Sequence, residues 1–115
     1  MLGKTLRQQR ELLKANDRSY SLRQVALRVG IEPAYLSKIE RGDMPPPGEE
    51  TIKKLAIELS LDSDVLLALA GKVSTDLQEV IRKRPQLFAD LIRQLREVPD
   101  DAIVRVVREV SDGNW

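Results

Sequence analysis

Hydrophobic positions along the first half of the chain recur every three or four residues, which is the spacing of amphipathic helices. Two such patterns flank a glycine between Ser21 and Gly42, and the first has its apolar positions at Leu22, Val25, Ala26 and Val29. Gly30 suits the left-handed conformation that ends a helix, and Pro33 suits the first turn of the next. Leu36 and Ile39 then face inward, so this stretch predicts two short helices joined by a tight turn.

The second helix of this pair is expected at about residues 33–41, and similar patterns predict further helices on both sides of the pair, at about residues 3–15, 49–59, 62–71, 75–84, 85–97 and 99–110. In the first of them Leu6, Leu12 and Leu13 are candidate core residues. Residues 16–20 and the proline-rich residues 42–48 predict loops. We therefore expect an all-α fold class, with a five-helix domain over residues 1–72 and a C-terminal helical extension over residues 73–115.

A short helix followed by a second helix with an outward polar face is typical of the helix-turn-helix, whose second helix enters the DNA major groove. The run GIEPAYLSKIERG, preceded by LRQQRELL and followed by TIKKLAIELSL, resembles the phage-repressor-type family, also called the Cro/C1 or xenobiotic-response-element (XRE) family. The resemblance covers about residues 2–71. It implies a repressor-like DNA-binding domain in a transcriptional regulator.

Mapped onto this sequence, the base-reading positions of that family are Pro33, Ala34, Tyr35 and Lys38, with Ser37 on the flank. Lys38 can donate to guanine, and Ala34 can touch a thymine methyl. Pro33 lacks the amide with which family members that carry glutamine there bind adenine, which weakens direct readout. Tyr35 has two interpretations, a phosphate or base-edge contact or a half-buried packing role.

Other residues are expected to hold the protein on DNA, some from helix chemistry and some from the resemblance. Ser21, Arg23 and Gln24 lie at the start of the helix before the turn, where free amides favour a phosphate. Ser21 and Gln24 also have capping-box spacing, so Gln24 has capping alone as its second interpretation. Arg41 matches a phosphate-contacting position or is a solvated surface charge. Arg10 and Glu40 match an ion pair that orients the recognition helix.

Charge is unevenly divided along the chain. Residues 1–42 carry nine basic and four acidic residues, residues 43–71 two and six, and residues 72–115 eight and eight. The basic excess therefore falls on the segment expected to meet phosphates. Asp43, Glu49 and Glu50 would repel the DNA backbone, so either their loop stays away from DNA or affinity is modest and depends on dimerisation.

The C-terminal extension carries helical apolar stripes that must be buried somewhere. Their residues are Leu77, Val80, Ile81, Leu87, Phe88, Leu91, Ile92, Leu95, Val98, Ile103, Val106, Val107 and Val110. We favour a homodimer contact over a cover for the N-terminal domain, because operators of this class are read by dimers. The basic run 82–84 has two interpretations, a DNA contact or a solvated face, and we favour the solvated face. Trp115 is either an anchoring side chain or a frayed end.

Composition excludes several other classes. With no Cys and no His there is no disulfide framework and no usual zinc site, so we expect no metal and no cofactor. No nucleophile–base motif supports an enzyme, and neither a signal peptide nor a membrane span is visible, which fits a cytoplasmic protein. The expected function is a double-stranded-DNA-binding repressor acting as a homodimer. The alternative is an antitoxin-like module with weak DNA readout that binds a partner protein through the C-terminal helices.

Overall fold

The computed structural model describes residues 1–113, and within them every regular element is a helix, which confirms the all-α prediction. The chain divides into two compact units, Met1–Ser74 and a second that begins at Thr75. The sequence pattern placed this boundary after Lys72. Trp115, for which two interpretations were open, lies outside the described residues.

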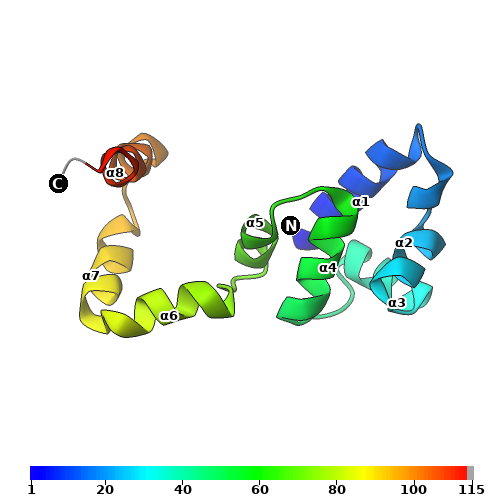
Figure 1. Ribbon diagram of the computed structural model, residues 1–115, viewed down its shortest axis with the longest axis horizontal. Coiled ribbons are helices and arrows are strands. Elements are labelled where there is room, and N and C mark those ends of the chain that lie inside the picture. The colour runs from blue at the N-terminus through cyan, green and yellow to red at the C-terminus, as the bar shows by residue number, and fades with distance from the viewer. Residues whose placement is uncertain (114–115) are drawn as a thin grey trace. The chain divides into compact units, whose positions relative to one another are not determined.

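The first unit holds five α-helices and a short 3₁₀ helix (Figure 1). They are α1 (Leu2–Lys14), η1 (Arg18–Tyr20), α2 (Leu22–Val29), α3 (Pro33–Arg41), α4 (Glu49–Leu59) and α5 (Ser63–Leu69). Helix α1 packs against α3 and α4, α2 packs against the same two helices, and α5 packs on α4. The helix-turn-helix pair α2–α3 is thus held from behind by α1 and α4.

Local sequence sets the ends of the helix-turn-helix. Ser21 Oγ accepts a hydrogen bond from the amide of Gln24 at 3.2 Å, as an N-cap residue does. Gly30 ends α2 in the left-handed region with φ of 83°, and Gly42 ends α3 with φ of 76°. Pro33 occupies the first turn of α3. Proline restricts φ at the start of α3, and glycine adopts the left-handed conformation after its end without a steric penalty, so local sequence sets both ends of α3.

The core of the first unit is aliphatic, and it lies where α1 to α5 meet. It consists of Leu2, Leu6, Val25, Ala26, Val29, Leu36, Ile39, Ile52, Leu55, Ala56, Leu59, Leu66 and Leu67, with Leu13 partly buried against it. The prediction of Leu12 as a core residue was wrong, because Leu12 is 67% exposed. The buried face of α1 runs through Leu2, Leu6 and Arg10, and Leu12 lies about 200° around the helix from Arg10.

Helix α1 approaches the end of α3 very closely at Gly3. A Cβ atom on Gly3 would lie 2.2 Å from the carbonyl oxygen of Ile39 and 2.7 Å from that of Glu40. Both oxygens belong to the backbone of α3, so no side-chain rotation could relieve the overlap. Gly3 therefore sets how near α1 can lie to the last turn of α3.

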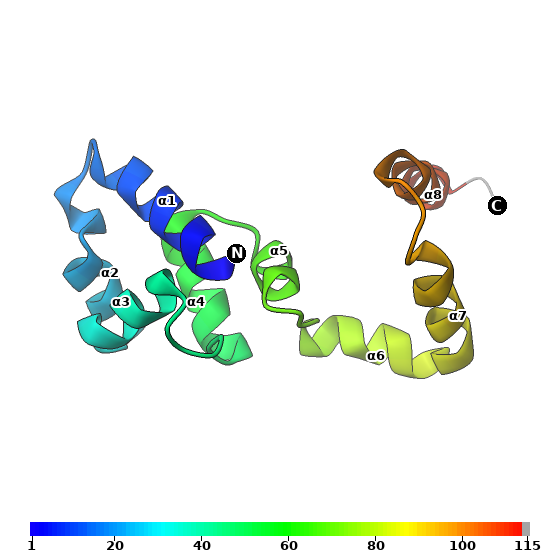
Figure 2. The same ribbon diagram turned by 180° about the vertical axis from the view of Figure 1, so that it is seen from behind.

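The second unit consists of α6 (Thr75–Lys83), α7 (Pro85–Leu95) and α8 (Asp100–Asp112). Helices α6 and α7 contact each other and meet at a corner at Arg84 (Figure 2). None of the three helices has a buried residue. Among residues 1–113, no helix combines the length and the apolar character that crossing a membrane requires.

Candidate nucleic-acid interface

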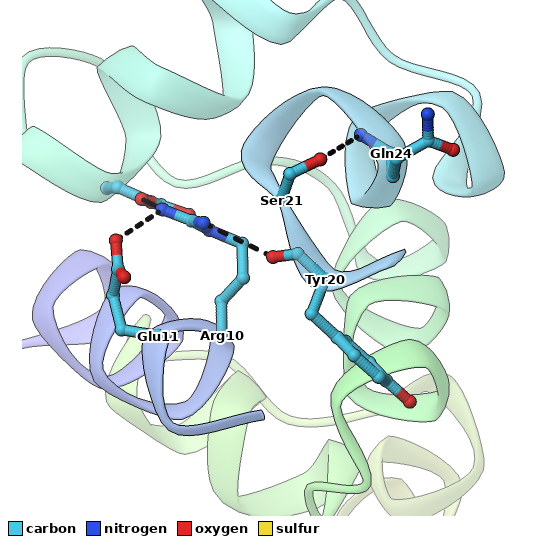
Figure 3. A network of polar contacts seen from close by, with 6 residues as sticks. Arg10, Glu11, Tyr20, Ser21 and Gln24 are labelled. Carbon is cyan, nitrogen blue, oxygen red and sulfur yellow. Dashed lines mark hydrogen bonds and ion pairs between the residues drawn. The ribbon is translucent and has the colours of Figure 1, made fainter. Parts of the chain in front are cut away.

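The start of α2 offers amide donors beside exposed polar side chains. The amides of the first helical turn have no partner inside their helix, and Ser21 caps one of them, that of Gln24. The reciprocal half of the predicted capping box does not form, because the amide of Ser21 donates instead to the carbonyl of Arg18 at 3.1 Å. The Gln24 side chain is exposed and points away from Ser21 (Figure 3). Arg23 is also exposed.

Helix α3 presents a polar face outward and an apolar face to the core. Ala34 and Lys38 are exposed, and Pro33, Tyr35 and Ser37 are half-buried. Leu36 and Ile39 are buried on the opposite side. Tyr35 packs partly against the core, so its packing role and an outward hydroxyl are both compatible with its position. This face supplies a cationic donor and a small apolar group, which are the two kinds of base contact expected from the sequence.

The ion pair of Arg10 with Glu40 ties α3 to α1. Arg10 Nε donates to Glu40 Oε2 at 2.7 Å and Nη2 donates to Glu40 Oε1 at 2.9 Å, a two-point geometry with side chains only 5% and 4% exposed. Arg10 Nη1 also donates to the carbonyl of Tyr20 at 3.3 Å (Figure 3). The hydrogen bond to Glu40 raises the pKa of Arg10 above its ordinary value, against the opposing effect of burial. One guanidinium thus links α1, the segment before α2, and α3.

Arg41, at the end of α3, is paired within the chain. Its Nε donates to Asp43 Oδ2 at 2.9 Å and its Nη1 donates to Ser37 Oγ at 3.2 Å. The side chains of Arg41 and Asp43 are 53% and 58% exposed. Asp43, which the sequence suggested only as a source of repulsion, is therefore the direct partner of a candidate phosphate contact.

Two surface hollows bring some of the predicted residues together, whereas Ser21, Ala34, Tyr35 and Lys38 line neither of them. One, of about 300 Å³, is lined by Arg23, Gln24, Leu27, Ile31, Glu32 and Pro33. The other, of about 220 Å³, is lined by Arg7, Arg10, Leu22, Ser37, Glu40 and Arg41. The first joins the start of α2 to the start of α3, and the second joins α1 to the start of α2 and the end of α3.

Arg7 is the residue that sequence reasoning missed. It is exposed on α1 and lines the second hollow with Arg41. Arg7 precedes Arg10 by three residues, so the two lie on neighbouring parts of one helix face. That spacing could have identified Arg7 as a candidate site residue. The arrangement as a whole offers guanidinium, ammonium, hydroxyl and backbone amide donors on one side of α2–α3, which suits phosphate oxygens and base edges.

Comparison with known proteins agrees with this geometry. A family model described as helix-turn-helix matches residues 6–66, more than half of the chain. The uncharacterized HTH-type transcriptional regulator RghRB of Bacillus subtilis (strain 168) is 40% identical over 73 residues, which are 64% of this chain and 51% of that protein. The chain thus spans about half the length of RghRB.

A second relative matches further along the chain. The HTH-type transcriptional regulator SlrR of Bacillus subtilis (strain 168) is 34% identical over 128 aligned positions, covering 99% of this chain and 80% of SlrR. Among solved structures, a SinR protein–SinI protein complex has a chain with a TM-score of 0.51 and 20% identity, covering 96% of this chain and 95% of that one. That similarity shows the fold. The family model and the near full-length relative together show that this chain belongs to the helix-turn-helix family of DNA-binding transcriptional regulators.

Proposed function

We propose that this regulator is a repressor that inserts α3 into the major groove of its operator. The observation that carries the proposal is the outward face of α3, where Ala34 and Lys38 are exposed, on a helix fixed from behind by the Arg10–Glu40 pair. Lys38 and Ala34 contact bases, Pro33, Tyr35 and Ser37 lie at the edges of the groove, and Ser21, Arg23, Gln24 and Arg41 contact phosphates. A fixed helix is what sequence readout requires, because base contacts depend on its register in the groove.

The proposal includes a homodimer joined through α6 to α8. Its support is the apolar surface that these helices and the segment between α7 and α8 leave open, namely Leu77, Val80, Leu87, Leu91, Ile92, Val98, Val104, Val106, Val107 and Val110, each at least 37% exposed. Apolar surface of this extent marks an interaction site more often than a solvated face. A two-fold axis would present two copies of α3 to half-sites about one DNA turn apart.

Selection of bound sequences from random duplex DNA, followed by footprinting on the enriched site, tests this function. We expect a two-fold-related site with protected half-sites about 10 base pairs apart. Reporter repression from a promoter that contains the site then tests the direction of regulation. Enrichment of no sequence, or activation of the reporter, would contradict the proposal.

A second candidate function is capture of a partner protein by α6 to α8. The solved neighbour is a complex of a SinR protein with a SinI protein, and the same exposed stripes on this chain could receive a helix of another protein. Sedimentation of the purified chain discriminates the two, because a homodimer leaves no free apolar stripe. For either function we propose that the protein acts by binding, without catalysis, in the cytoplasm where its DNA lies.

A further inference from the structure

The hollow of about 220 Å³ between α1, α2 and α3 is rich in guanidinium groups. Three arginines line it, and they differ in how their charge is balanced. Arg10 is neutralised by Glu40 at 2.7 Å and is nearly inaccessible. Arg41 is balanced by the exposed Asp43 at 2.9 Å. Within residues 1–113, Arg7 has no carboxylate at ion-pair distance, so its charge is uncompensated.

The geometry points to a phosphate clamp, in which Arg7 and Arg41 bind one phosphate of the DNA backbone in this hollow. In the free protein Asp43 is paired with Arg41, and the phosphate replaces Asp43 when DNA binds. This inference rests on the proposed binding of DNA by the α2–α3 face. It adds Arg7 as a contact on α1. It also gives Asp43 a role, as the competitor that a phosphate must displace.

The hollow suits a diester phosphate for three reasons. Guanidinium groups from α1 and α3 approach it from two sides, and two charged donors hold a phosphate better than one. Leu22 also lines it, and the amide of this first-turn residue has no partner within its own helix. Ser37 Oγ, which already accepts from Arg41 Nη1 at 3.2 Å, holds Arg41 at the rim when Asp43 leaves.

A phosphate can replace Asp43 at low cost, because the ion pair that Asp43 forms with Arg41 is exposed to solvent. With side chains 53% and 58% exposed, the Arg41–Asp43 pair lies in the class that contributes little to stability. A DNA phosphate arrives with counterions that its capture releases to the solution, and that release favours the exchange at low salt. Asp43 therefore lowers affinity for any DNA sequence by the same factor.

Binding to a random-sequence duplex tests the clamp, because phosphate contacts carry no sequence information. Fluorescence anisotropy of the full chain with a labelled 30-base-pair duplex is measured across salt concentrations. Arg7→Gln should weaken binding about eightfold per protomer at 0.1 M salt and make the slope of log K against log salt shallower by about 0.9. Lys54→Gln removes the same charge from an exposed residue of α4 outside the hollow, and it should change neither quantity by as much.

A double-mutant cycle tests the competition. Asp43→Asn should raise affinity about two- to fivefold, the range expected when an exposed pair is broken, but should have no effect in an Arg41→Gln background. Glu32→Gln is the matched control: Glu32 is exposed at the N-cap of α3, and its effect should be equal in both backgrounds. Circular dichroism melts verify that each exposed substitution leaves the fold intact.

Two results would overturn the clamp while leaving the proposed function in place. One is an Arg7→Gln protein that binds like the Lys54→Gln protein. The other is a gain from Asp43→Asn that persists without Arg41, which would make Asp43 a source of general repulsion. Failure of the unaltered chain to bind duplex DNA at low salt would instead contradict the proposed function and the clamp with it.

Discussion

Replacement of Arg10 with methionine would leave Glu40 as a charged carboxylate in the interior without its partner. The Glu40 side chain is only 4% exposed, and both of its oxygens accept hydrogen bonds from Arg10, at 2.7 and 2.9 Å. Removal of one partner of a buried pair costs about 3–5 kcal/mol, because the remaining charge stays desolvated. The change also removes the 3.3 Å hydrogen bond to the carbonyl of Tyr20, worth about 1 kcal/mol.

That loss is large for a domain of this size. At the usual 0.05–0.15 kcal/mol per residue, a unit that spans Met1–Ser74 has a free energy of unfolding of about 4–11 kcal/mol. Arg10→Met alone should therefore remove about 4–6 kcal/mol of that free energy, which would unfold the first unit if its stability lies at the low end of the range. The double change Arg10→Met with Glu40→Leu removes both charges, so it should lie within about 2 kcal/mol of the unaltered protein.

Urea denaturation followed by circular dichroism measures four proteins: the unaltered chain, Arg10→Met, Glu40→Leu and the double variant. The matched control is Arg28→Met, because Arg28 pairs with Glu58 at 2.6 Å where the side chains are still 32% and 27% exposed. That substitution should cost only about 1 kcal/mol, with the contact of Arg28 over the ring of Tyr20 included. The reasoning would be refuted if the losses from Arg10→Met and Glu40→Leu simply added in the double variant.

Three further changes have expected outcomes. Lys38→Ala should cost about 1–3 kcal/mol on the best operator and relax preference at one base pair, measured by competition with single-base variants; equal losses on random DNA would make Lys38 a phosphate contact. A chain shortened to Met1–Ser74 should keep its melting transition but sediment as a monomer and bind a half-site weakly. A full-length chain that is itself monomeric at tens of micromolar would contradict a dimer contact in α6–α8. Gly3→Ala should destabilise the first unit by about 1–3 kcal/mol, because the new methyl would lie 2.2 Å from the carbonyl oxygen of Ile39. This overlap outweighs the better helix propensity of alanine. An unchanged melting temperature would show that α1 shifts freely.

Both ends of helix α3 could be predicted to the residue, because the amino acids at each end determine where the helix begins and stops. Pro33 restricts the first turn, and Gly42 supplies the left-handed residue after Arg41. The prediction for α1 failed at Leu12 for a physical reason: a charged residue, Arg10, occupies the inward position. Hydrophobic spacing alone cannot reveal that an arginine is inside, since the partner that makes its burial possible is thirty residues away.

The candidate interface was partly predictable. Ser21, Lys38 and Arg41 follow from motif spacing and exposed position, although their contacts with DNA stay predictions. The capture of Arg41 by Asp43 and the place of Arg7 beside it depend on how α1 and the loop after α3 fold back. Those arrangements arise from packing between segments, which a periodic pattern does not specify.

The close contact at Gly3 has a consequence for how this regulator can acquire new targets. At Gly3, α1 lies directly against the backbone of the last turn of α3, so the position of that turn depends on its packing against α1. If Ala34 and Lys38, which are exposed, contact bases as we propose, their substitution will alter base preference without disturbing the packing of α3. Exposed residues of α3 can therefore be changed by natural variation or protein engineering while the scaffold stays the same, provided that the buried residues Leu36, Ile39 and Glu40 are kept.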